Sequence, residues 1–150
     1  MLGRVPPAAW FFAFLLGGWG LDHLVPLPNP FPSVAWQLCP ALFLFLASAL
    51  FAASAIRRFF AKETSLLPFS QASVLLTTGP FRLSRNPLYV SLVATLLAFG
   101  FLLASFWVVL LTFLLFGALN RFVIPSEEAA LLRTFGPEYI AYARRVRRWL

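Results

Sequence analysis

The composition of this 150-residue chain excludes an ordinary soluble domain, because 61% of its residues are hydrophobic and only 11% are charged, against about 45–50% and 25% in globular proteins. So few polar groups cannot cover a water-facing surface, and we predict one all-α domain, residues 1–150, that crosses a membrane several times. The net charge of +7 does not by itself indicate nucleic-acid binding, since the cations lie beside apolar segments. The single Cys39 cannot form an internal disulfide, and the spacing of residues indicates no metal site.

Two apolar runs predict transmembrane helices in the first 60 residues. Residues 8–21 have aromatic side chains near both ends, which is typical of a membrane-spanning helix; a secretory signal peptide would need a small-residue cleavage site, and none follows Gly20. Four prolines within residues 25–33 predict an extended loop. The second run, residues 35–56, can cross a hydrocarbon core about 30 Å thick, and we expect it to end at Arg57.

The third apolar block, residues 87–124, is predicted to be a helical hairpin. A single helix over this block would be about 57 Å long, nearly twice the thickness of a membrane core, so we expect a turn at residues 100–105. Before the block, residues 58–78 are expected to form a polar loop or a surface segment. After it, helices are expected at residues 126–135 and 138–150, separated by Gly136 and Pro137.

The placement of the cations predicts the orientation of the chain. With four spans, all twelve Lys and Arg residues fall on one side, in the N-terminal head, between the second and third helices, and after the fourth. The positive-inside rule then puts both termini on the cytoplasmic side of the cell (inner) membrane. The basic tail is expected to contact anionic lipid headgroups, at about 1 kcal/mol per cation, through Arg144, Arg145, Arg147 and Arg148.

Polar side chains at the two ends of the hairpin are the candidates for a binding site. The hairpin returns the chain, so Arg85 and Asn86 at its start should lie near Arg121, Glu127 and Glu128 at its end. A guanidinium group suits a carboxylate, and carboxylates suit an amine or a ribose diol, so these groups together suit a small zwitterion that carries a ribose. No ionisable residue lies in the middle of a predicted span, which argues against ion transport.

The same polar groups also have structural interpretations. Arg82 and Arg85 could be interfacial anchors that extend toward lipid phosphates. Glu127 and Glu128 could simply stabilise the N-terminus of a helix. The sole histidine, His23, is expected to be structural. Spacing alone therefore leaves both interpretations open.

Two segments resemble the signature of small integral-membrane methyltransferases. Residues 78–89 (TGPFRLSRNPLY) resemble the T-x-G-P-[FY]-R-x-x-R-[HN]-P-x-Y motif of the isoprenylcysteine carboxyl methyltransferase and phospholipid N-methyltransferase relatives. Residues 127–142 (EEAALLRTFGPEYIAY) resemble the E-E-x-x-L-x-x-x-F-G-x-x-Y-x-x-Y tail of the same family. The two motifs occur in the family's order and are joined by an apolar hairpin, so residues 77–150 would form the methyltransferase core, and residues 1–60 the first two spans.

This resemblance implies methyl transfer from S-adenosylmethionine to a lipophilic acceptor at the cytoplasmic membrane face. The cofactor would lie beside the last hairpin, under a roof formed by the C-terminal segment. The family's cofactor-binding positions correspond to Asn86, Tyr89, Glu127, Glu128, Tyr139 and Tyr142. The positions that orient the acceptor and cofactor carboxylates correspond to Arg85 and Arg121, and Glu128 is the proton acceptor if the methyl acceptor is an amine or a thiol.

The segments depart from the family motif at two positions. Asn86 replaces the histidine of the common R-H-P form, so no titrating imidazole is available there. Ser91 replaces a glycine, which affects how closely a ligand can approach the helix. These departures leave open which molecule accepts the methyl group, and whether an oxygen, a nitrogen or a sulfur atom is methylated.

Two other functions are compatible with parts of the pattern. Membrane reductases of the steroid 5α-reductase type use NADPH and read R-H-P-N-Y-x-G-E, but this chain has Leu88 and Leu92 where they have Asn and Glu. A non-catalytic membrane scaffold would use its cations only as anchors, and it predicts that Arg85→Ala is silent. In each case the four short spans could pair with a second copy of the chain.

Overall fold

The computed structural model describes residues 5–29, 31–62 and 74–150, and within them the chain is all-helical with no strand. The elements are α1 (Pro7–Leu24), α2 (Val34–Ala61), the 3₁₀ helix η2 (Gly79–Arg82), α3 (Pro87–Leu102), α4 (Phe106–Ala118), the π-helical η3 (Leu119–Val123), α5 (Ile124–Phe135) and α6 (Pro137–Arg145). The prediction of an all-α chain is confirmed.

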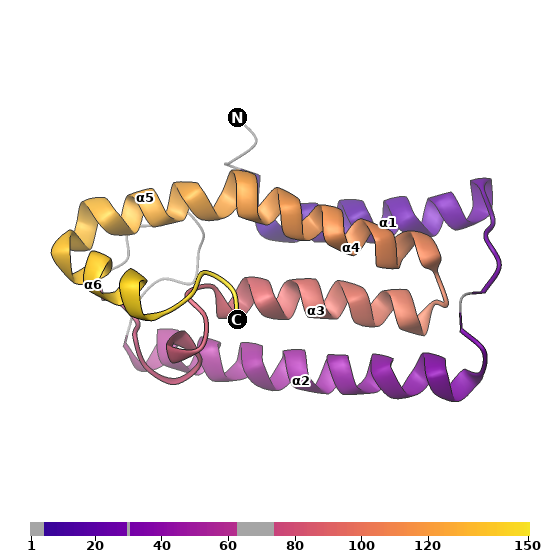
Figure 1. Ribbon diagram of the computed structural model, residues 1–150, viewed down its shortest axis with the longest axis horizontal. Helices are drawn as coiled ribbons and strands as arrows, with labels where there is room; N and C mark the ends of the chain where they lie inside the picture. The colour runs from indigo at the N-terminus through magenta and orange to yellow at the C-terminus, as the bar shows by residue number, and fades with distance from the viewer. Residues whose placement is uncertain (1–4, 30, 63–73) are drawn as a thin grey trace.

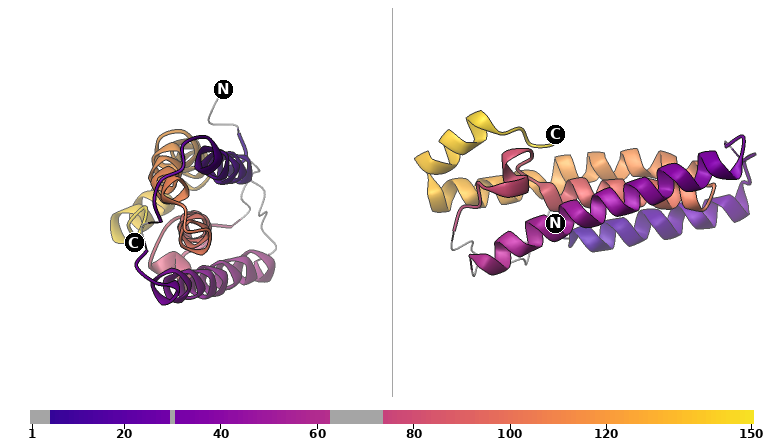
Figure 2. Two further views of the ribbon diagram at one scale, coloured as in Figure 1. Left: turned by 90° about the vertical axis from the view of Figure 1, so that its right-hand side faces the viewer. Right: turned by 90° about the horizontal axis from the view of Figure 1, so that it is seen from below.

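The long helices form an elongated bundle with α3 at its centre (Figure 1). α3 packs against α2 on one side and against α4 on the other, and α1 packs against α4. An end view shows the same order, with α1 and α4 together on one side and α2 on the opposite side of α3 (Figure 2). The predicted fold-back is confirmed, because α3 and α4 are antiparallel and residues 103–105 form the turn between them.

Two helical stretches are long and apolar enough to cross a membrane, Val34–Ala61 and the continuous helix Phe106–Phe135 that α4, η3 and α5 form together. α3 is apolar but shorter, with 16 residues. The number of spans, predicted as four, and the direction in which the chain crosses the membrane stay predictions.

Three predicted helix ends are wrong. α2 continues to Ala61, past the expected end at Arg57, because long Arg side chains can occupy a last helical turn and interact favourably with its carbonyl groups. α5 follows α4 without a loop, and Pro125 lies directly after the π-helical turn of η3, where the regular hydrogen-bond pattern of the helix is already interrupted. α6 ends at Arg145 and not at Leu150. The rest of the expected 58–78 loop includes residues 63–73, which lie outside the described part of the chain.

Glycines allow the helices of the bundle to approach closely. A Cβ at Gly18 of α1 would lie 2.7 Å from Val108 Cγ2 and 3.0 Å from the Val108 backbone. A Cβ at Gly100 of α3 would lie 2.7 Å from Val109 Cγ2. Without these methyl groups the backbone of α4 can pack directly on both neighbours, as small residues permit in membrane bundles. The apolar core, which includes Leu96, Val108 and Leu115, fills this junction.

The polar elements gather at one end of the bundle. The loop from α1 to α2 and the turn from α3 to α4 lie at the other end (Figure 1). The end with the polar elements is the one where α2 ends and α3 begins, and it also contains η2, α5, α6 and the C-terminus. The two segments that resemble a family signature are therefore brought to the same place.

Candidate functional site

The C-terminal residues 146–150, called here the C-terminal strap, return from α6 to the start of α3. The carbonyl oxygen of Arg147 accepts a hydrogen bond of 2.9 Å from the backbone N–H of Arg85. The carbonyl oxygen of Arg148 accepts from Asn86 Nδ2 at 2.9 Å and from Ser84 Oγ at 3.2 Å. Asn86 thus faces the strap in this structure, and three hydrogen bonds fix the strap across the first motif.

Glu128 lies between two guanidinium groups. Arg85 Nη1 is 3.1 Å from Glu128 Oε1. Arg148 donates from Nε to Oε1 at 3.1 Å and from Nη2 to Oε2, and the hydrogen bond to Glu128 raises the pKa of Arg148. The carboxylate therefore joins three segments of the chain, namely the start of α3, the first half of α5 and the strap.

Asn120 extends this network to the continuous helix. Its Oδ1 accepts from Arg148 Nη1 and from Trp149 Nε1, both at 3.1 Å, and the Trp149 ring packs against Phe116 with 4.4 Å between centroids. Asn120 belongs to η3, and a π-helical turn inside a longer helix is often found at functional sites. This amide is the second anchor of the strap.

A second carboxylate, Glu127, points to a different partner. Tyr89 of α3 donates a hydrogen bond of 2.6 Å from its hydroxyl group to Glu127 Oε1. Both side chains are partly buried. The two adjacent glutamates thus have different partners. Glu127 is bound by Tyr89 of α3, whereas Glu128 is bound by Arg85, which precedes α3.

The tyrosines of α6 cover Arg85 and η2. Arg85 Nη1 donates to the Tyr139 hydroxyl group at 2.9 Å, and its Cζ lies 5.9 Å from the centre of the Tyr139 ring. The Tyr142 hydroxyl group donates to the carbonyl oxygen of Phe81 at 2.7 Å. Burial raises the pKa of both phenols, so they stay neutral over the physiological range.

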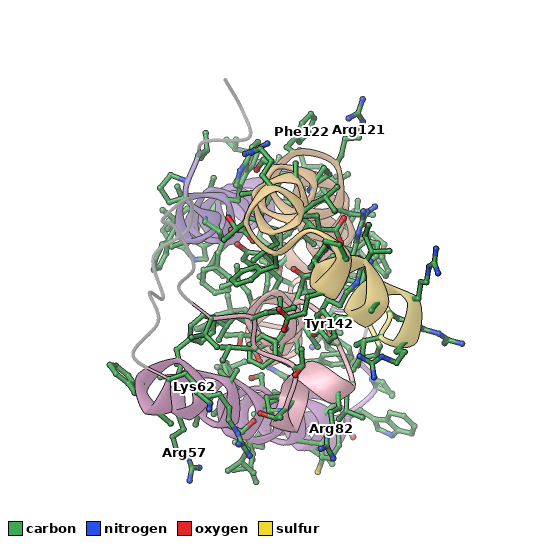
Figure 3. The ribbon with its side chains drawn as sticks, turned by 90° about the vertical axis from the view of Figure 1, so that its left-hand side faces the viewer. Arg57, Lys62, Arg82, Arg121, Phe122 and Tyr142 are labelled. Carbon is green, nitrogen blue, oxygen red and sulfur yellow. The ribbon has the colours of Figure 1, made fainter. Side chains whose placement is uncertain are left out.

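The structure does not bring Arg121 to this cluster. Its side chain is exposed and points away from Tyr142, on the outer side of the continuous helix (Figure 3). In a regular α-helix, Arg121 would stand about two turns before Glu128, on the same face. The π-helical turn of η3 shifts the register by one residue, so Asn120 lies on the face of Glu128 and Arg121 does not.

The expectation for Arg148 is also wrong. The sequence predicts that it faces lipid together with Arg144, Arg145 and Arg147, but its guanidinium group is bound to Glu128 and Asn120. The other three side chains are exposed. The reason is that α6 ends at Arg145 and the extended residue Val146 turns the strap back toward α3.

Sequence reasoning did not place Ser84 or Arg148 in the site, and it counted Asn120 among the polar groups of the cytoplasmic side without giving it a role. A lone amide inside a long apolar run was a visible signal for Asn120, because a polar group in such a run needs a partner. Four arginines in the last seven residues gave no signal to separate Arg148 from its neighbours.

The family model that matches this chain covers the first motif and both glutamates of the cluster, and it ends before Tyr139 and the C-terminal strap. The family model described as phospholipid methyltransferase matches residues 36–138. The nickel-cobalt-cadmium resistance protein NccN of Alcaligenes xylosoxydans xylosoxydans is 36% identical over 75 residues, which are 50% of this chain and 35% of that protein. The cobalt-zinc-cadmium resistance protein CzcN of Cupriavidus metallidurans is 37% identical over 73 residues, 49% of this chain and 33% of that protein.

A shorter relative is matched over its whole length. An uncharacterized protein of Haemophilus influenzae is 40% identical over 65 residues, which are 42% of this chain and 100% of that protein. By contrast, the match spans about a third of the length of the two resistance proteins. No solved structure matches the chain at a significant level.

Proposed function

This chain belongs to the phospholipid methyltransferase family, and on that premise we propose that it transfers a methyl group from S-adenosylmethionine to a membrane-embedded or lipophilic small molecule at the cytoplasmic membrane face. The observation that carries the proposal is the contact between the two motif segments. Arg85 of the first motif lies 3.1 Å from Glu128 of the second, and Tyr89 lies 2.6 Å from Glu127. Residues far apart in sequence thus form one polar cluster at one end of an apolar bundle.

The residues of the cluster fit this cofactor. Arg85 Nε is buried and, in the part of the chain that the structure describes, has no hydrogen-bond partner. A buried guanidinium donor without a partner is costly, and a carboxylate is the group that it binds best. Glu127 and Glu128 offer acceptor oxygens for an amine and for ribose hydroxyl groups. S-Adenosylmethionine carries all three of these groups.

When bound, S-adenosylmethionine supplies a methyl group that its sulfonium centre has already activated. The protein then mainly has to align the reactants and exclude water. We assign the binding of the cofactor's carboxylate to Arg85, and further polar contacts with the cofactor to Asn86, Tyr89, Glu127 and Glu128. Tyr139 and Tyr142, which are buried, form the cover against solvent.

The role of Glu128 depends on the acceptor. A carboxylate acceptor needs no base. An amine or a thiol must release a proton, and Glu128 can take it only if Arg148 first leaves, because both oxygens of Glu128 accept hydrogen bonds from guanidinium groups. In the arrangement described here, Glu128 and Tyr139 both hold Nη1 of Arg85.

The proposed location follows from the position of the cluster. It lies at the end of the bundle where α2 finishes with Arg57 and Arg58, and the positive-inside rule puts such an end in the cytoplasm. The cofactor would then arrive from water, and the lipophilic acceptor from the bilayer. This division explains why a methyltransferase is built into an apolar bundle.

Equilibrium binding of labelled S-adenosylmethionine to the detergent-purified protein tests the proposal. We expect saturable binding by the wild type, a loss of at least tenfold in affinity for Arg85→Gln and Glu128→Gln, and no change for the control Arg133→Gln, whose side chain is exposed on α5. Circular dichroism checks that each variant keeps its helices. No binding by folded wild-type protein, or binding of NADPH instead, would refute the proposed function.

A further inference from the structure

A pocket lies apart from the polar cluster, between the C-terminal part of α2 and η2. Its volume is about 590 Å³, which is within the range of small-molecule sites. Arg57 and Arg58 contribute its charged lining, and Phe51, Ala61, Pro80 and Leu83 contribute apolar surface. The described lining thus combines two guanidinium groups with apolar side chains and has no carboxylate.

The turn before η2 lets Arg58 lie close to the backbone. Gly79 has a φ of +64°, and a Cβ there would lie 3.0 Å from Arg58 Nε and 3.4 Å from its Nη2. Arg58 Nη1 donates to Thr78 Oγ1 at 3.5 Å. The guanidinium group is therefore held at the wall of the pocket by the turn, although the side chain remains exposed to solvent.

The pocket lies at the level where headgroups are expected. α2 is one of the two stretches that can cross a membrane, and Arg57 and Arg58 directly follow its apolar run. Figure 3, which views the molecule from the end with the polar elements, shows Arg57 on α2, Lys62 directly after α2 and Arg82 on η2 on the same side of the bundle. Cations in the last turn of a membrane helix extend into the headgroup region.

We propose that this pocket binds one anionic phospholipid, with Arg57 and Arg58 on the phosphate and the first methylene groups of an acyl chain against Phe51, Pro80 and Leu83. Guanidinium groups bind phosphate oxygens through paired, charge-assisted hydrogen bonds. The apolar lining favours a lipid over a free phosphate ion, because a phosphate ion would leave that surface uncovered. The proposed methyl transfer is not needed for this binding.

Binding of a short-chain lipid tests the inference. The probe is dihexanoyl phosphatidylglycerol, titrated below its micelle concentration into the detergent-purified chain, with dihexanoyl phosphatidylcholine and inorganic phosphate as comparison ligands. Each cation near an anionic lipid contributes roughly a fivefold change in affinity. We expect Arg57→Gln/Arg58→Gln to bind the probe about 25-fold more weakly, and Arg133→Gln, which removes an exposed cation from α5, to change binding less than twofold.

A third variant separates the pocket from its charge. Ala61→Phe keeps both arginines but fills part of the pocket, and we expect it to weaken binding of the probe at least tenfold. Labelled S-adenosylmethionine should bind these variants as it binds the wild type, so the two proposals fail independently. A loss in Arg133→Gln as large as that in Arg57→Gln/Arg58→Gln, no effect of Ala61→Phe, or equal affinity for inorganic phosphate and the lipid would overturn the inference.

Discussion

Replacement of Arg148 by glutamine tests the strongest structural claim made for the strap. The variant removes the guanidinium group that binds Glu128 and Asn120, and it keeps the carbonyl oxygen that accepts from Asn86 and Ser84. The backbone path of the strap should therefore survive. The variant loses the hydrogen bonds from Arg148 to Glu128 and to Asn120.

The expected loss of stability follows from the contacts that remain. A hydrogen bond to a charged group contributes about 1.5–3 kcal/mol, but the side chain of Arg148 is 34% exposed, so solvent screens the pair and lowers its contribution. Glu128 keeps Arg85 at 3.1 Å, and Asn120 keeps Trp149 at 3.1 Å, so neither is left without a partner. We therefore expect the free energy of unfolding to fall by about 1–2 kcal/mol.

Arg147→Gln is the matched control for this change. It removes the same charge one residue earlier, and its side chain is exposed, so we expect less than about 0.5 kcal/mol. Both values come from denaturant titration of the detergent-solubilised protein followed by circular dichroism. In a double-mutant cycle, Arg148→Gln and Glu128→Gln should couple by about 1 kcal/mol. Equal losses for the two arginine variants, or no coupling, would show that Arg148 is only a surface charge.

Two further changes use the same titration. Gly18→Ala should lower stability by about 1–2 kcal/mol, because its Cβ would lie 2.7 Å from Val108 Cγ2. Its control, Gly17→Ala, has nothing closer than 3.9 Å to the new Cβ and should raise stability by up to about 1 kcal/mol. Similar effects at both positions would contradict the close contact between α1 and α4. Tyr142→Phe removes the 2.7 Å bond to the Phe81 carbonyl oxygen and should cost about 1–2 kcal/mol at pH 8. Burial raises the pKa of Tyr142 above its unfolded value of about 10, so this difference should be complete below pH 10 and should shrink as the pH rises further; a difference that is unchanged well above pH 10 would refute this reasoning.

The class of the protein and the approximate place of its site follow from the amino-acid sequence. An apolar block too long for one span had to fold back, and the turn at residues 103–105 lies within the predicted range. Because a hairpin returns the chain to the side where it started, Arg85 and Glu128 had to be near one another, and they are. Both inferences rest on chain length and on the thickness of a membrane, which do not depend on side-chain detail.

The groups that surround Glu128 could not be predicted without the three-dimensional structure. The π-helical turn of η3 rotates Asn120 toward the strap and Arg121 to the outside, and a shift of one residue in helical register leaves little trace in the hydrophobic pattern. The strap itself is held by three backbone carbonyl contacts, which any residue at positions 147 and 148 could make. Which of the four C-terminal arginines reaches Glu128 therefore depends on where α6 ends. Packing sets this helix boundary, and four identical cations in the sequence do not indicate it.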